Sequence, residues 1–281
     1  MNDVSKENQV EFAEDVCALP LARRLAAMLD RDPASLREGD PLPHGWHVML
    51  FNTPTMQSQL RHDGAAYLGV TLPDIGLPRL MLGGRQNRFA GEIPIGARLR
   101  RESRQGEVQL KEGRSGRFAL VKVEHRIFVE GASEAVLVEN QDYVLRAASG
   151  ATAPAPSLVV TAAAPQPPAP DAVHTIVPDE QLLFRYSAIT DNPHRIHYDH
   201  AYATGVEGYP ALVVNGSIPA MFLLELFRST AGREPVVFTS RNVAPMFCGR
   251  ALRLNVLNEG ASWRLWAQDE QGTTTFDARA E

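Results

Sequence analysis

The sequence predicts an α+β protein in which antiparallel β-sheets curl around a buried α-helix. The first observation is that residues 218–227, IPAMFLLELF, are apolar on nearly every face, as is typical of a helix enclosed by the core. The second is that apolar and polar residues alternate through residues 96–147, which is the pattern of half-buried strands. The third is a series of short strand-like segments separated by turns in residues 233–281. A buried helix followed by such a meander requires a sheet that wraps around the helix.

Length and composition are those of an ordinary globular protein. The 281 residues could form two domains or one large one. The formal net charge of −5 and the lack of a Lys/Arg tract argue against nucleic acid as a partner. Cys17 and Cys248 lie far apart, which favours a reducing compartment. The polar N-terminus does not resemble a signal peptide and no apolar run could span a bilayer, so we expect a cytoplasmic protein with no membrane partner.

In the N-terminal half, residues 20–36 have apolar residues at helical intervals and predict an amphipathic helix that ends near Asp32-Pro33. Residues 41–90 are rich in Pro and Gly, and we expect them to be irregular. Within them, residues 55–68 are a polar and poor candidate for a central helix. The alternating region that follows predicts three or more antiparallel strands. Its turns are expected to contain Gly113, Gly116 and Gly131.

Residues 148–173 are dominated by Ala and Pro, a composition that cannot build a core and prefers extended conformations. We predict that they link an N-terminal domain, residues 1–147, to a C-terminal domain, residues 174–281. The C-terminal domain opens with QLLFRYSAIT, residues 181–190, which we predict to be a strand. The buried helix follows, with Ser217 as its cap and Pro219 in its first turn. A sheet wrapped around a central helix is a hotdog fold. We predict one in each domain, with the N-terminal one degenerate because its helix is poor.

Residues 189–203, ITDNPHRIHYDHAYA, carry three histidines and two aspartates. A solvated loop is one interpretation, supported by the turn signal Asn192-Pro193, but the apolar segments on both sides place this loop between core elements. A metal site is a second interpretation, based on His194-x-x-His197-x-Asp199. Pro193 lies next to His194, and Asp199 is two residues beyond His197, so the three candidate ligands cannot share one helix face. We therefore predict no metal site.

An acid–base centre is the third interpretation. Adding water across a C=C bond conjugated to a thioester needs one group to activate the water and one to protonate the α-carbon. His197 and Asp191 could share the water and do both, with Asn192 and His194 close by. Residues 215–217, NGS, open the buried helix and offer backbone N–H groups to an enolate oxygen. Gly216 would let the thioester approach the backbone closely.

Two blocks of sequence carry a resemblance to a known family. They are FRYSAITDNPHRIHYDHAYA, residues 184–203, and GYPALVVNGSIPAMFLLELF, residues 208–227. Both resemble the MaoC-like hydratase/dehydratase family, and most closely its two-domain branch, which includes hydratases of itaconyl-CoA and mesaconyl-CoA and a mitochondrial-type 3-hydroxyacyl-thioester dehydratase. Matching segments such as LPHGWHVMLFNTP extend the resemblance over most of the chain. It implies a double hotdog fold with one active site in the C-terminal domain.

The family pattern implies that His197 is the catalytic histidine and that Asn192 orients the catalytic carboxylate. The position of the family aspartate falls on Thr190. Asp191 is the carboxylate on the same side of the loop and is our candidate for that role, with Asp199 as the alternative.

Four further residues are candidates for binding the acyl-CoA. Arg85, Arg88 and Arg195 could contact the CoA phosphates or a substrate carboxylate, although surface arginines are more often solvated. Asn215 stands where the two-domain branch usually has histidine and is expected to line the thioester pocket, and Gly216 and Ser217 are expected to support the oxyanion.

The predicted function is the reversible hydration of a short branched or dicarboxylic enoyl-CoA, such as itaconyl-CoA or mesaconyl-CoA, with an acyl-CoA substrate as partner and no cofactor. Dehydration of longer 3-hydroxyacyl thioesters, thioester hydrolysis and non-catalytic acyl-CoA binding remain alternatives. The chain is also expected to be able to form a homodimer.

Overall fold

The computed structural model describes residues 10–52, 54–65, 69–72, 74–113, 116–147 and 169–281. Within these residues, ten antiparallel strands form one continuous sheet in the order β1-β3-β4-β5-β2-β7-β10-β9-β8-β6. The N-terminal half contributes β1 (Val10–Val16), β2 (Arg79–Phe89), β3 (Arg98–Gly113), β4 (Gly116–Val129) and β5 (Leu137–Arg146). The C-terminal half contributes β6 (Ala172–Ile176), β7 (Val237–Asn242), β8 (Leu252–Asn258), β9 (Trp263–Gln268) and β10 (Thr274–Ala280).

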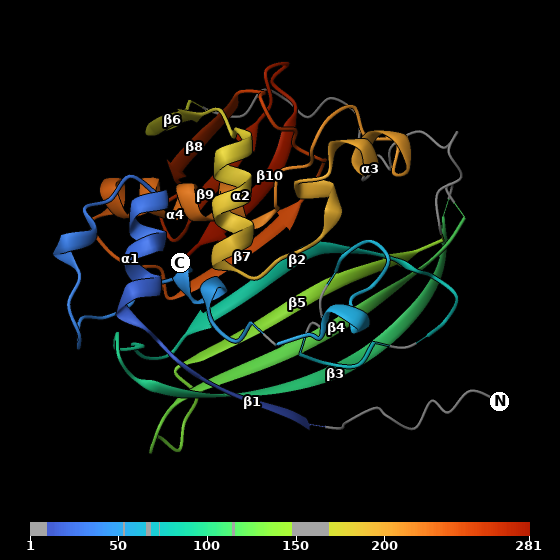
Figure 1. The fold of residues 1–281 in the computed structure, drawn as a ribbon. Coiled ribbons are helices and arrows are strands. Elements are labelled where there is room, and N and C mark those ends of the chain that lie inside the picture. The colour runs from blue at the N-terminus through green and yellow to red at the C-terminus, as the bar shows by residue number, and fades with distance from the viewer. Residues whose placement is uncertain (1–9, 53, 66–68, 73, 114–115, 148–168) are drawn as a thin grey trace.

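The two halves meet where β2 pairs with β7, with Arg85 opposite Ser240. Figure 1 shows the N-terminal strands as a long curved layer, with the C-terminal strands and most helices on the other side of this junction. The junction places β2 of the N-terminal half directly beside the C-terminal half, so a site can draw side chains from both.

The helices are α1 (Leu19–Met28), α2 (Glu180–Ile189), α3 (His200–Gly205) and α4 (Ser217–Ala231). Short 3₁₀ turns occur at η1 (Pro33–Ser35), η2 (Trp46–Met49), η3 (Gln57–Gln59) and η4 (Arg195–His197). The predicted buried helix is confirmed: α4 packs against β6, β8 and β9, and Ile218, Leu223 and Phe227 are fully buried. Its predicted cap is wrong, because the helix already begins at Ser217 and the N-cap is Gly216, with no side-chain cap.

The predicted strand at residues 181–190 is also wrong, because these residues form α2. The Asp179 carboxylate accepts a hydrogen bond from the Leu182 amide at 2.8 Å and caps the helix. Leu183, Tyr186 and Ile189 are buried at helical spacing. A cap followed by one apolar stripe therefore prevailed over the β-propensity of the aromatic residues.

The first unit lacks a long central helix within the described part of the chain. Residues 55–65 form only η3, and Val70 packs in a small separate cluster with Val121 and Val123 of β4 and Tyr143 of β5. Residues 41–90 are not irregular throughout, since β2 begins at Arg79, with an irregular register between Leu82 and Gly84.

The main core runs through both halves. Trp46, from η2, is fully buried and donates from its indole nitrogen to Glu225 of α4 at 3.0 Å. Most of the predicted linker lies outside the described residues, and β6 begins at Ala172, inside the predicted range 148–173. Among the helices that the structure describes, none is both long and apolar enough to cross a bilayer.

Candidate active site

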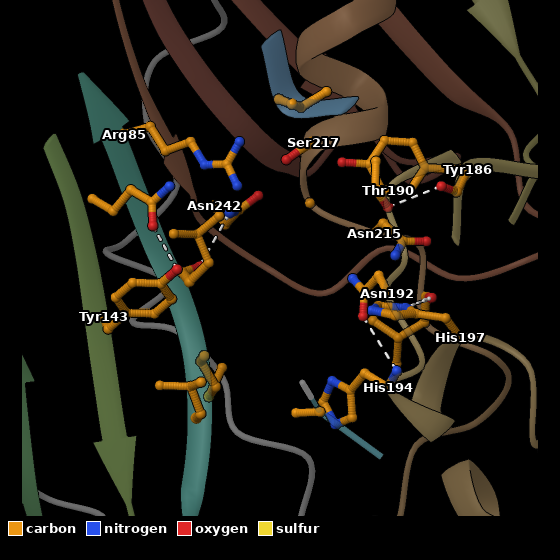
Figure 2. A pocket seen from close by; sticks show the side chains of 18 of the residues that line it. Arg85, Tyr143, Tyr186, Thr190, Asn192, His194, His197, Asn215, Ser217 and Asn242 are labelled. Carbon is orange, nitrogen blue, oxygen red and sulfur yellow. Dashed lines mark hydrogen bonds between the residues drawn. The ribbon is translucent and has the colours of Figure 1, made fainter. Parts of the chain in front are cut away.

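A cavity of about 370 Å³ lies between the two halves and is lined by residues of both. Figure 2 shows its two walls: Arg85 and Tyr143 extend from β2 and β5 on one side, and Asn192, His194 and His197 face them from the C-terminal half. The histidine-rich loop therefore forms one wall, while the sheet of the N-terminal half forms the other.

The loop wall begins with the end of helix α2. Asp191 has a left-handed backbone, with φ of 44°, and the Asn192 amide donates to the Ser187 carbonyl at 2.9 Å. This is the hydrogen-bond pattern with which a left-handed residue ends a helix, and aspartate tolerates that conformation better than most residues. The Asp191 side chain is exposed and lines the cavity. The local fold thus explains an aspartate at this position before any catalytic role is considered.

Asn192 then shapes the turn into η4. Its side-chain oxygen accepts a hydrogen bond from the His194 amide at 3.2 Å, which fixes the chain across Pro193. The turn delivers His197 to the cavity wall. Asn192 therefore orients the histidine segment, whereas the family resemblance implied that it orients a carboxylate.

His197 is buried, and its ring is fixed by one strong contact. Its Nδ1 lies 2.7 Å from the Val213 carbonyl oxygen, which can only accept, so Nδ1 carries the proton and Nε2 is left as an acceptor. Burial, assisted by the nearby His194 and opposed by the Val213 carbonyl, lowers the pKa of His197 to about 3. The ring is therefore neutral near pH 7, and its Nε2 is unprotonated in a low-dielectric setting.

Asp199 and Arg195 are engaged with each other. The guanidinium of Arg195 donates to Asp199 at 2.7 Å and 3.0 Å and lies over the Tyr202 ring, with 4.1 Å from its carbon to the ring centroid. Asp199 also caps α3 by accepting from the Tyr202 amide at 3.0 Å. Neither residue lines the cavity, and the exposed Arg88 does not line it either.

The start of α4 contributes Asn215, Gly216 and Ser217 to the cavity lining. Asn215 is buried, and neither polar atom of its side chain has a hydrogen-bond partner among the described residues. Gly216 is required by packing as well, because a Cβ there would lie 2.7 Å from the Asn242 side chain. An unpartnered amide at the positive end of a buried helix is suited to binding a carbonyl oxygen.

Sequence reasoning missed Asp63, which the N-terminal half brings to the loop. Asp63 is buried, lines the cavity, and has a carboxylate oxygen 4.0 Å from Nε2 of His194. Its backbone carbonyl accepts from the Arg195 amide at 2.8 Å, and a Cβ at Gly64 would lie 2.2 Å from the Pro193 carbonyl. Burial would raise the pKa of Asp63, but the Ala65 amide and Arg61 hold it below its usual value. No local signal marks Asp63 as a site residue, because the loop residues that it contacts, His194 and Arg195, lie far away in the chain.

The opposite wall is also charged. Arg85 and Glu139 form an ion pair with 3.3 Å between Nε and Oε1, and Nε2 of His47 lies 3.7 Å from the other Glu139 oxygen. Burial would raise the pKa of Glu139, but Arg85 and His47 hold it well below its usual range. Arg85, which the sequence suggested as a binding residue, therefore lines the cavity. Its charged neighbours Glu139 and His47 were not indicated by the sequence.

Within the described residues, no three His, Cys, Asp or Glu side chains converge as metal ligands would. In the predicted alternative His194-x-x-His197-x-Asp199, Nδ1 of His197 is turned to the Val213 carbonyl and Asp199 to Arg195.

The family model described as hydroxyacyl-thioester dehydratase type 2 matches residues 45–248. The chain belongs to this family. A relative from Chloroflexus aurantiacus, mesaconyl-C(4)-CoA hydratase, is 38% identical over 281 residues, covering 99% of this chain and 96% of that protein. The mitochondrial hydroxyacyl-thioester dehydratase type 2 of Schizosaccharomyces pombe is 36% identical over 89 residues, covering 31% of this chain and 30% of its own.

Comparison with solved structures confirms the fold. A MaoC-like dehydratase from Phytophthora capsici superposes with a TM-score of 0.71 at 14% identity, covering 99% of this chain and 98% of its own. A Mycobacterium tuberculosis protein described as having a double hotdog fold superposes with a TM-score of 0.62 at 14% identity, covering 98% and 95%. The predicted α+β double hotdog is therefore confirmed, and the protein is an enzyme of the hydratase/dehydratase type.

Proposed function

We propose that the protein reversibly hydrates a short, branched, dicarboxylic enoyl-CoA of the mesaconyl-CoA or itaconyl-CoA type, with His197 as the acid–base residue. The observation that carries the proposal is the buried, neutral His197, whose Nδ1–H is fixed on the Val213 carbonyl so that Nε2 can take a proton. The similarity over nearly the whole chain to a mesaconyl-C(4)-CoA hydratase supports the substrate class. The cavity of about 370 Å³ is at the small end of ligand pockets and favours a short acyl group.

The proposed reaction needs one base and one set of hydrogen-bond donors for the thioester oxygen. Nε2 of His197 removes a proton from water as the water oxygen bonds to the β-carbon, and the electron pair of the C=C bond moves toward the thioester oxygen. The Asn215 amide and the backbone N–H groups at Gly216 and Ser217 stabilise that oxygen. The imidazolium then returns the proton to the α-carbon, so one water is added and His197 is neutral again.

A carboxylate would assist this cycle, because burial makes the imidazolium costly. We propose Asp191, which lines the cavity next to the loop, as the group that shares the water with His197. Asp63 is proposed to hold His194, and through it the loop, in place. The two roles differ: Asp191 would act on water, whereas Asp63 would act on the position of the ring.

Dehydration of a 3-hydroxyacyl thioester is the second candidate function. It is favoured by the family match and by the partial similarity to the mitochondrial enzyme of Schizosaccharomyces pombe. Chemically it is the reverse of the same reaction, so the two candidates differ in substrate and in physiological direction.

The test is to incubate the protein with mesaconyl-CoA, itaconyl-CoA and crotonyl-CoA, and to follow thioester mass and free thiol together. A hydratase increases the thioester mass by one water and releases no thiol, and we expect this with a branched dicarboxylic substrate. Release of free CoA would instead identify a thioesterase. Binding without any product would identify a non-catalytic module, and either result would overturn the proposal.

A further inference from the structure

The cavity wall opposite His197 combines side chains that the proposed chemistry does not use. We call it the basic wall and define it by Arg85, Glu139, His47 and His125, all of which line the cavity. Figure 2 shows Arg85 reaching from β2 into the space that separates it from the loop wall. A substrate bound beside His197 would therefore have its far end near this guanidinium.

We propose that Arg85 binds the free carboxylate of a dicarboxylic acyl-CoA and so selects the substrate. The inference rests on the proposed function, since mesaconyl and itaconyl groups each keep one carboxylate when the other is joined to CoA. An arginine fork can hold a carboxylate with two parallel hydrogen bonds, which a neutral acyl group cannot accept.

The first support is the orientation of Arg85. Its Nε is buried and lies 3.3 Å from Oε1 of Glu139, while 21% of the side chain stays accessible. Glu139 therefore lies beside the buried Nε, and the accessible part of this cavity-lining side chain can meet a ligand.

The second support is incomplete hydrogen bonding. Within the part of the chain that the structure describes, Nδ1 and Nε2 of His47, Nε of Arg85 and Oε1 of Glu139 are buried without a hydrogen-bond partner. Their ion-pair contacts are too long or too poorly aligned for hydrogen bonds. Buried ion pairs often stabilise a fold no better than apolar residues would, so a half-satisfied pair at a cavity indicates a role in binding.

The third support is the electrostatic setting. Burial lowers the pKa of His125 to about 4, so this ring is neutral near pH 7 and its Nδ1 lies 2.8 Å from the Ser103 hydroxyl. The negative charge of the basic wall is that of Glu139, which Arg85 offsets. A substrate carboxylate would approach the outer edge of Arg85, with the guanidinium between it and Glu139.

The test is a binding measurement that needs no turnover. Succinyl-CoA and butyryl-CoA have no C=C bond and differ by a carboxylate in place of a methyl group. We expect the unmodified protein to bind succinyl-CoA roughly 10- to 100-fold more tightly than butyryl-CoA by calorimetry. R85M should abolish this preference, R85K should keep part of it, and affinity for butyryl-CoA should change little.

Because R85M leaves Glu139 buried without its ion partner, the double variant R85M/E139M provides a second test with both charges removed. R241Q is the matched control: Arg241 lies on the neighbouring β7, with a side chain that is 75% exposed. Equal affinities in the unmodified protein, or a preference that survives in R85M/E139M, would overturn the subsite. Loss of the preference in a protein that hydrates nothing would support the subsite while contradicting the proposed function.

Discussion

Replacing His197 by glutamine should make the protein less sensitive to mild acid. In the folded protein the pKa of His197 is lowered from 6.5 to about 3, because burial disfavours the charged ring. Between these values the unfolded chain binds a proton that the folded chain does not. Stability due to this group is therefore fully present above pH 6.5 and falls as the pH drops toward 3.

The magnitude follows from the shift. Each pH unit within this window costs about 1.36 kcal/mol, so acidification from pH 6.5 to about pH 5 should remove roughly 2 kcal/mol through this histidine alone. Glutamine cannot be protonated but can still donate to the Val213 carbonyl. H197Q should therefore lose roughly 2 kcal/mol less than the unmodified protein over the same pH interval.

The assay is urea unfolding at pH 7.5 and pH 5, for the unmodified protein, H197Q and H200Q. Other titrating groups, including the buried His125, are present in all three proteins and cancel in the comparison. H200Q removes an exposed histidine from the same segment and serves as the control. If H197Q and the unmodified protein lose the same free energy of unfolding on acidification, His197 is not held neutral by burial and the assignment of its state is wrong.

Three further predictions concern the loop and its partners. D191N should lower kcat by about 10²-fold or more with little change in KM. D199A should keep its turnover and lose about 0.5–2 kcal/mol of stability, because alanine cannot cap α3. The reverse pattern would move the carboxylate role to Asp199. D63N should reduce kcat through the loop while retaining acyl-CoA affinity, and a variant with unaltered kcat would exclude a positioning role. Dialysis against a chelator should leave turnover unchanged, and activity lost with chelation and restored by zinc or iron would favour a metal site.

The parts of the fold that could be predicted carry a local periodic signal. Helix α4 is apolar on nearly every face, and β3 to β5 fall in the region where apolar and polar residues alternate. The segments of β7 to β10 are short and separated by turns, so all of these elements were expected correctly. Helix α2 was missed because Phe184 and Tyr186 suggested a strand, although Phe184 is 66% exposed and only Tyr186 faces the core. The Asp179 cap was the signal that could have decided the question.

The residues of the site likewise fall into those that the sequence predicted and those that it could not. His197, Asn192 and the segment from Asn215 to Ser217 are near one another in sequence, and the structure brings them together on one wall. Asp63 and the Glu139 partner of Arg85 could not be predicted, because they reach the cavity only through the β2–β7 junction and the packing of residues 61–65 on the loop. Arg195 was selected for its charge, but its partner at i+4 is Asp199, so the pair stabilises the loop.

The most direct test of the account is the turnover of H197A with mesaconyl-CoA, measured as water added per enzyme and compared with the unmodified protein. Thermal unfolding of both proteins at pH 7.5 shows whether the variant is folded. We expect a folded variant whose kcat is lower by about 10²–10⁴-fold, since the base that activates water is gone. A folded H197A within a few-fold of the unmodified protein would show that water is activated elsewhere and would contradict the central claim.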